Sequence, residues 1–282
     1  KHPGYYTDKI KYDGPCDIFP NWEKNTESWG VDCYKFRHDQ LSYILGKKAT
    51  TRRKIATASN CVVEYVGSVA FFAGTRLERA RGRDYVEWLC SQVDAKHSQT
   101  VNIDLRQHLS DVAIVRIPSS TVGYITGEKR KTLAKIEEEH DCLMFYIDKN
   151  SKTPNNFNLH SDLNKKEEIL GIFSHSIRGR IGAALKIKAA VEMKAKEYEK
   201  ENTENLKLES LLLQPYIGDF DIDTFELSNR EISFALGKEG STRKKLAQSS
   251  NAILEYIGNV AYFAGSKVER NRVRDYLSWL IQ

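Results

Sequence analysis

The chain contains one segment twice, and this repeat constrains the fold more than any other feature of the sequence. Residues 43–91 align without a gap to residues 234–282, with 25 identities in 49 positions. Two segments this similar are expected to adopt the same fold. The copies begin 191 residues apart. Because the repeats of a solenoid follow one another directly, we expect a further unit of comparable size between these two.

Each copy shows the same order of predicted elements, which is described here for the first copy. Apolar and polar residues alternate over 32–37, as in a half-buried strand. A short helix then ends at Gly46, and a second helix is opened by Thr50, a favourable N-cap residue. Two apolar strands, 61–67 and 69–74, precede a final helix. The predicted order is therefore β-α-α-β-β-α.

The final helix of the first copy carries an apolar stripe at helical spacing, formed by Leu77, Ala80, Tyr85, Trp88 and Leu89. The aromatic residues recur in the second copy as Tyr276 and Trp279. Aromatic side chains can stack on nucleobases, but the helical spacing favours a place in the core. Phe71 and Tyr262 lie on apolar strands, where an outward-facing aromatic side chain suits packing between units.

The middle of the chain repeats this order of elements with a weaker match. A strand over 111–118 precedes a short helix that ends at Gly127, and a long helix is predicted over 176–200. A polar segment at about 149–166 replaces the tight turn between the last two strands and is predicted to be a loop.

The chain is therefore divided into three predicted modules after an unassigned N-terminal extension of residues 1–30. Module 1 covers residues 31–96, module 2 covers 97–202 and module 3 covers 203–282. The predicted fold class is α+β: each module is expected to form a three-stranded antiparallel sheet with three helices packed on one face.

The turn between the two short helices is the strongest candidate for a functional site in each module. The three turns are Gly46-Lys47-Lys48-Ala49, Gly127-Glu128-Lys129-Arg130 and Gly237-Lys238-Glu239-Gly240. A glycine turn lets the backbone of a polyanion approach the N–H groups that open the following helix. Cations follow each turn, namely Arg52, Arg53 and Lys54, then Lys131, and finally Arg243, Lys244 and Lys245.

In the order of elements, the G-x-x-G turn and the basic helix that follows it, residues 31–282 resemble the eukaryotic-type KH family. That family holds about four nucleotides of single-stranded nucleic acid between the G-x-x-G loop and an apolar groove. The resemblance implies that Gly237 to Gly240 contact the nucleic-acid backbone. It also implies that four residues of module 3 form the groove, namely Ile232, Leu236, Leu246 and Ile253.

Two of the three turns depart from the G-x-x-G pattern. Ala49 is a small change that still permits close approach of a backbone, whereas Arg130 either crowds a phosphate or contacts it through its charge. The resemblance thus assigns nucleic-acid contacts to Gly46, Lys47, Lys48, Ala49, Arg52, Arg53, Gly127, Lys129, Arg130, Lys131, Ile232, Leu236, Gly237, Lys238, Glu239, Gly240, Arg243, Lys244 and Ile253.

Charge points to module 1 as the most basic part of the chain. Residues 31–96 contain 12 Lys and Arg against 7 Asp and Glu, which accounts for the whole formal charge of +5.

The five cysteines are scattered without a Cys-x-x-Cys pair, which argues against a disulfide framework and a zinc site and fits a reducing compartment. No metal or cofactor is therefore expected.

No sequence motif indicates an enzyme. The acidic run Glu137-Glu138-Glu139 has no partner nucleophile, and we predict that it forms a solvated helix face. No apolar stretch approaches the roughly 20 residues of a membrane span.

We therefore expect an intracellular protein, cytoplasmic or nuclear, that binds single-stranded nucleic acid without catalysis. RNA is the favoured ligand and DNA is not excluded. The alternative is a set of degenerate KH modules that act as a protein-protein scaffold in a larger assembly.

Overall fold

The structure is a computed structural model that describes residues 29–95, 100–148, 150–153, 167–198 and 218–282. Most of the N-terminal extension, the centre of the predicted 149–166 loop and the beginning of module 3 lie outside these residues. The described part is α+β, as predicted. In module 1 the elements are β1 (Gly30–Lys35), α1 (Leu41–Leu45), α2 (Thr50–Ser59), β2 (Val62–Val66), β3 (Val69–Gly74) and α3 (Arg76–Asp94).

The same order of elements returns in the rest of the chain. Module 2 contains β4 (Thr100–Val101), β5 (Val112–Pro118), α4 (Val122–Thr126), α5 (Lys131–Glu139), β6 (Leu143–Ile147), β7 (Glu167–Phe173) and α6 (Ile177–Tyr198). Module 3 contains β8 (Asp221–Glu226), α7 (Asn229–Leu236), α8 (Ser241–Ser250), β9 (Ile253–Ile257), β10 (Val260–Gly265) and α9 (Lys267–Ile281).

The sheets of modules 1 and 3 have three antiparallel strands, in the orders β1-β3-β2 and β8-β10-β9. The prediction of three antiparallel strands is wrong for module 2, whose sheet has the order β4-β6-β7-β5. The additional strand β4 pairs in parallel with the edge of β6, where Thr100 lies opposite Tyr146. An edge strand leaves backbone groups unpaired, and β4 satisfies those of β6.

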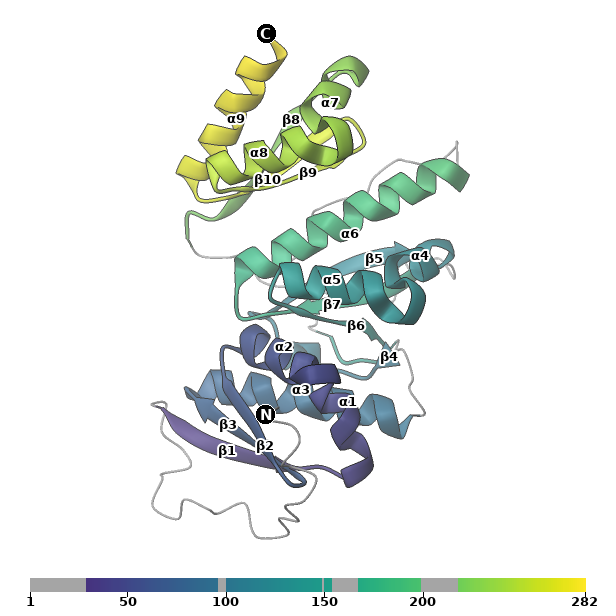
Figure 1. Cartoon of the computed structure of the whole chain (residues 1–282), viewed down its shortest axis with the longest axis vertical. Helices are drawn as coiled ribbons and strands as arrows, with labels where there is room; N and C mark the ends of the chain where they lie inside the picture. The colour runs from purple at the N-terminus through teal and green to yellow at the C-terminus, as the bar shows by residue number, and fades with distance from the viewer. Residues whose placement is uncertain (1–28, 96–99, 149, 154–166, 199–217) are drawn as a thin grey trace.

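The three modules stack so that sheets and helix layers alternate along the long axis (Figure 1). The helices of module 1 lie between their own sheet and the sheet of module 2, where Trp88 of α3 packs against Phe145 and Phe173. Helix α6 lies between the sheets of modules 2 and 3, and its buried residues share one apolar cluster with Ile257 and Tyr262. Packing of Tyr262 between modules is thus confirmed.

The predicted apolar stripe of the final helix is only partly confirmed. Tyr85, Trp88 and Leu89 are buried, but Leu77 is 67% exposed and Ala80 is also exposed. The core prediction is wrong for Trp279 of module 3, which is 66% exposed although its copy Trp88 is 8% exposed. The difference arises because a following sheet covers α3, whereas no described element covers α9 in this way.

An arginine occupies the first turn of each final helix; Arg79 and Arg180 are buried and Arg270 is mostly buried. In module 1 Arg79 is fully buried, lies 3.0 Å from the carboxylate of Asp32 and donates to the Gly74 carbonyl at 2.7 Å. Arg180 and Arg270 likewise donate to the carbonyls of Ser174 and Gly265. These side chains tie the helix to the end of the preceding strand.

Candidate nucleic-acid interface

The three turns between the short helices share one backbone conformation. Their first glycines, Gly46, Gly127 and Gly237, have φ of 70, 69 and 68° and ψ of 168, 168 and 172°. The third and fourth residues of each turn are left-handed, as in Lys48 at φ 55° and Ala49 at φ 58°. The departures from glycine at the fourth position therefore leave the turn unchanged.

Steric contacts explain why the first position is always glycine and the fourth is not. A Cβ at Gly46, Gly127 or Gly237 would overlap the Oγ1 of Thr51, Thr132 or Thr242. A Cβ at Gly240 would have no neighbour closer than the Arg243 Nε at 3.8 Å. The pattern G-x-x-x-x-T, present in all three turns, is a sequence signal that the G-x-x-G comparison missed.

The helices that follow the turns begin without a side-chain cap. The N-cap residues are Ala49, Arg130 and Gly240, all left-handed, and none makes a side-chain cap hydrogen bond. The prediction that Thr50 is an N-cap is wrong, because it is the first residue inside helix α2. The first N–H of each helix, at Thr50, Lys131 and Ser241, donates to a carbonyl of the turn. The following N–H groups belong to the first helical turn, where intrahelical partners are lacking, so a helix start without a side-chain cap suits an anionic ligand there.

Exposed cations surround these helix starts. Lys47 and Lys48 are exposed in the first turn, as are Lys129 and Lys131 at the second turn and Lys238 and Lys244 at the third. Arg53 is also exposed and donates to the Lys48 carbonyl at 3.2 Å, which places its guanidinium beside the first turn. Each turn therefore has exposed positive charge beside it, although the second and third turns also carry exposed acids, Glu128 and Glu239, and Glu128 lies 3.9 Å from the Lys131 Nζ.

Arg52 and Arg243, by contrast, brace their helices against the sheet. Arg52 donates to the Val63 carbonyl at 2.7 Å and pairs with Glu64. Its copy Arg243 donates to the Leu254 carbonyl at 2.8 Å and pairs with the adjacent glutamate, Glu255. Each arginine uses its Nη1 atom in these contacts, so Arg52 and Arg243 have a structural role in addition to the phosphate contacts predicted for them.

Of the four residues assigned to the apolar groove of module 3, Ile253 lies on a different face from Ile232 and Leu246. Ile232 and Leu246 pack against the core of module 3, and Leu236 is partly exposed at the end of α7. Ile253 instead packs with the α6 cluster on the other face of the sheet. Successive strand residues face opposite sides, so Leu254 and not Ile253 points toward the helices of module 3.

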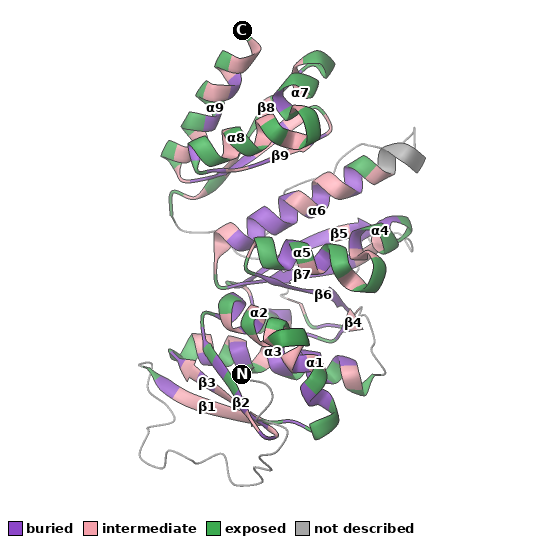
Figure 2. Ribbon diagram, in the orientation of Figure 1, coloured by how far each residue is buried: buried purple, intermediate pink, exposed green. Residues whose placement is uncertain are grey.

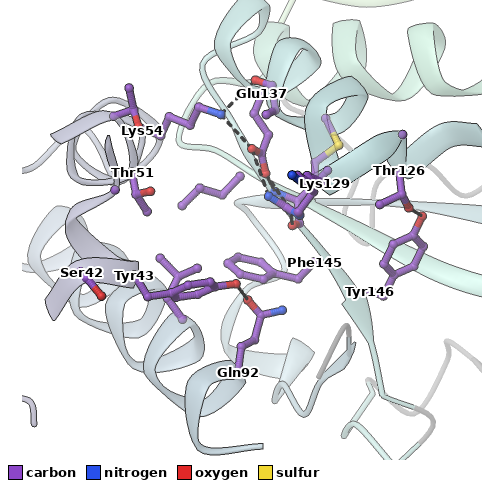
Figure 3. Close-up of a pocket in the computed structure, with 18 residues that line it drawn as sticks. Ser42, Tyr43, Thr51, Lys54, Gln92, Thr126, Lys129, Glu137, Phe145 and Tyr146 are labelled. Atoms are coloured by element: carbon purple, nitrogen blue, oxygen red, sulfur yellow. Dashed lines mark hydrogen bonds and ion pairs between the residues drawn. The ribbon is translucent and has the colours of Figure 1, made fainter. Parts of the chain in front are cut away.

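A cavity of about 890 Å³ lies where modules 1 and 2 meet (Figure 3). The glycines of two turns, Gly46 and Gly127, both line it, as do the aromatic side chains of Tyr43, Phe145 and Tyr146. The groove beside the second turn is thus closed on one side by the helices of module 1.

Glu137 forms a buried ion cluster at this cavity (Figure 3), so the prediction of a solvated acidic run is wrong for this residue. Its carboxylate accepts from Lys54 of module 1 at 3.0 Å, from Arg130 at 2.9 Å and from the Met144 N–H at 2.9 Å. Burial acts to lower the pKa of Arg130, but the Glu137 carboxylate outweighs it and the pKa is raised. Arg130 is therefore held toward Glu137.

The described residues contain no group of three or more His, Cys, Asp and Glu side chains arranged to hold a metal ion. Burial raises the pKa of the Cys61 and Cys90 thiols to about 12. Because the thiolate is the nucleophilic and metal-binding form, these two cysteines are inert. Among the described helices, none is both long and apolar enough to cross a membrane.

Comparison with known proteins gives no match to a family model or to a curated protein. Among solved structures, Dim2p from Pyrococcus horikoshii OT3 is 14% identical, with a TM-score of 0.31 over 60% of this chain and 89% of that one. A complex of a/eIF2alpha, aDim2p and rRNA from the same organism is 12% identical, with a TM-score of 0.32 over 62% and 88%. A structure described as KH domains is 12% identical, with a TM-score of 0.19 over 93% and 66%.

Proposed function

We propose that this chain binds single-stranded RNA through the turns of its modules and that it does so without catalysis. One observation carries the proposal: three turns of the same left-handed conformation each end at a helix start that has no side-chain cap and has exposed lysines around it. Backbone N–H groups at a helix start together with nearby cations suit a phosphate of the nucleic-acid backbone.

The turns of modules 1 and 3 are the stronger candidates within this proposal. Lys47 and Lys48 of the first turn and Lys238 of the third are exposed. In module 2 the fourth residue, Arg130, is held by Glu137, and Gly127 lines a cavity shared with module 1. We therefore assign the main phosphate contacts to the outer two modules and a smaller contribution to Lys129 and Lys131.

Linkage of weak sites supplies affinity in this proposal. A G-x-x-G loop holds only about four nucleotides, so a single module is expected to bind weakly. When one strand engages two modules of the same chain, the second binding event becomes intramolecular and raises the overall affinity by about 10² to 10⁴. A strand that spans modules 1 and 3 is therefore expected to bind more tightly than two separate short strands.

The test replaces turn residues by aspartate, which tolerates the left-handed conformation of the third position. The variants are Lys47→Asp with Lys48→Asp, and Lys238→Asp with Glu239→Asp. The matched control is Arg76→Asp with Lys267→Asp, which changes the net charge as much as the first pair does, at exposed residues that begin α3 and α9.

Binding of single-stranded RNA and DNA is measured against salt concentration for each variant. Each turn variant is expected to weaken RNA binding at least tenfold, while the control changes it less. Loss of two phosphate contacts, at Lys47 and Lys48, reduces the slope of log affinity against log salt by about 1.4 for a single strand, and loss of one contact, at Lys238, reduces it by about 0.7. Affinity that is the same in wild type and both turn variants would exclude the turns as the binding site.

A further inference from the structure

One face of module 3 carries the residues through which module 1 contacts module 2, yet none of the described elements covers this face in module 3. A shallow groove of about 380 Å³ on this face is lined by Thr242, Lys245, Leu246, Ser249, Tyr276 and Trp279. We call this face the α8/α9 face. Figure 2 shows that α8 and α9 are largely exposed or partly exposed, whereas much of α6 is buried.

The corresponding residues of module 1 contact module 2. The ring centroids of Trp88 and Phe173 are 4.8 Å apart, and the Tyr85 hydroxyl lies 3.2 Å from the Asp111 carboxylate. Lys54 donates to the Ala134 carbonyl at 2.9 Å. Their copies in the repeat are Trp279, Tyr276 and Lys245, which all line the groove of the α8/α9 face.

The other end of the stack presents the matching surface. In module 3 the sheet face covered by α6 is formed by Ile222, Ile253, Ile257, Tyr262 and Ala264. Their copies in module 1 are Val31, Val62, Val66, Phe71 and Ala73, each of which is partly or largely exposed. Val62 is 54% exposed. We call this apolar surface the β1–β3 face.

We propose that the α8/α9 face docks onto the β1–β3 face of a second copy of the chain, in the same helix-on-sheet arrangement that joins the modules within one copy. The chain itself supplies both halves of the contact, and each half repeats residues that are buried in an internal interface. The contact is head-to-tail, so it adds copies in an open series and does not close as a symmetric dimer does.

The size of the exposed aromatic side chains favours contact of the α8/α9 face with a second copy of the chain over contact with solvent. A tryptophan that is two-thirds exposed leaves a large apolar area in water, and such residues are enriched at the centres of protein interfaces. Trp279 and the neighbouring Tyr276 have ring centroids 5.6 Å apart, so they form one continuous apolar surface. Trp279, Tyr276 and Val62 belong to none of the turns, so the proposal can be tested without RNA.

Sedimentation equilibrium over a range of protein concentrations, without RNA, tests the proposal. The weight-average mass of the wild type is expected to rise with concentration up to about 1 mM, the limit of weak association. Trp279→Arg and Val62→Asp are each expected to weaken association at least tenfold. The matched control is Val268→Arg: Val268 is 58% exposed on the same helix, but its copy Leu77 stays exposed in module 1.

Mixing the two interface variants gives the sharper result. Trp279→Arg retains its β1–β3 face and Val62→Asp retains its α8/α9 face, so the mixture is expected to form a one-to-one dimer and nothing larger. A wild type that stays monomeric at every concentration would overturn the proposal. So would a mixture that stays monomeric while the wild type associates, or a Trp279→Arg variant that associates as strongly as the wild type.

Discussion

Gly237→Ala is expected to destabilise module 3 far more than Gly240→Ala, although both glycines belong to one turn. Gly237 has φ 68° and ψ 172°, a conformation that is essentially restricted to glycine. Gly240 has φ 73° and ψ 20°, which other residues adopt at a cost of about 1 kcal/mol. The two substitutions add the same methyl group, so their difference measures the geometry of the turn.

The magnitudes follow from the backbone and from Thr242. The restricted conformation at position 237 costs about 2 kcal/mol for alanine. A Cβ there also overlaps the Thr242 Oγ1 and lies 2.9 Å from the Thr242 backbone N, and displacement of that side chain adds about 1 kcal/mol. A Cβ at Gly240 makes only an ordinary contact with the Arg243 Nε at 3.8 Å, so the total for Gly240→Ala stays near 1 kcal/mol. We expect about 3 kcal/mol for Gly237→Ala.

Native-state hydrogen exchange of the amides in β9 and β10 gives the free energy of opening of module 3 itself. The double variant Gly237→Ala with Thr242→Ala serves as the control, because it removes the Oγ1 overlap while it keeps the backbone cost. It is expected to recover part of the loss. Equal destabilisation by Gly237→Ala and Gly240→Ala would refute the steric account of the turn.

Three further outcomes follow from the same contacts. Ala49→Gly relieves a left-handed alanine and is expected to raise the free energy of unfolding by about 1 kcal/mol in urea titration; a decrease would contradict the assigned conformation. Glu137→Gln leaves Lys54 and Arg130 without their carboxylate and is expected to lower the free energy of unfolding by about 2 to 4 kcal/mol. Addition of Lys54→Met to this variant is expected to make the loss smaller, and an undiminished loss in the double variant would exclude the ion cluster. Burial lowers the pKa of His140 from 6.5 to about 4, and Glu139 opposes the shift. As the pH falls, the unfolded chain therefore binds a proton at His140 before the folded chain does. The free energy of unfolding is expected to be unaffected by this group well above pH 6.5 and to fall by roughly 2 to 3 kcal/mol as the pH drops to about 4. His140→Gln should flatten the pH dependence in that window, and an unchanged profile would assign it to other groups.

The elements of the two outer modules could be predicted from sequence because local patterns and the repeat agreed. Alternation of apolar residues predicted β1 and β8 to within two residues of their bounds, and glycine marked the end of α1 and α7. Strand β4 was missed because two residues carry no usable periodicity. Its place depends on the free edge of β6, which only the assembled sheet provides.

The candidate site was predicted less completely than the fold. The turns follow from glycine spacing, but the roles of Arg52 and Arg243 depend on a glutamate in a neighbouring strand. Ile253 was placed on the wrong face because only the strand register decides which of two adjacent apolar residues points to the helices. Long-range contacts of this kind leave no local sequence pattern.

The stack of modules also explains why identical residues have different surroundings. Trp88 and Trp279 occupy the same position of the repeat, so a local pattern predicts the same burial for both. One is covered by the sheet of the following module and the other is not. Burial of these side chains is therefore a property of the stack and not of the single module.

Amide protection of the turns on addition of RNA tests the central claim most directly. Hydrogen exchange of the full chain is compared with and without a single-stranded RNA long enough to reach modules 1 and 3. If the turns hold the RNA backbone, the amides of residues 46–51 and 237–242 are slowed on binding, and the Asp variants of these turns abolish the effect. Tight RNA binding that leaves both segments unprotected would contradict the account.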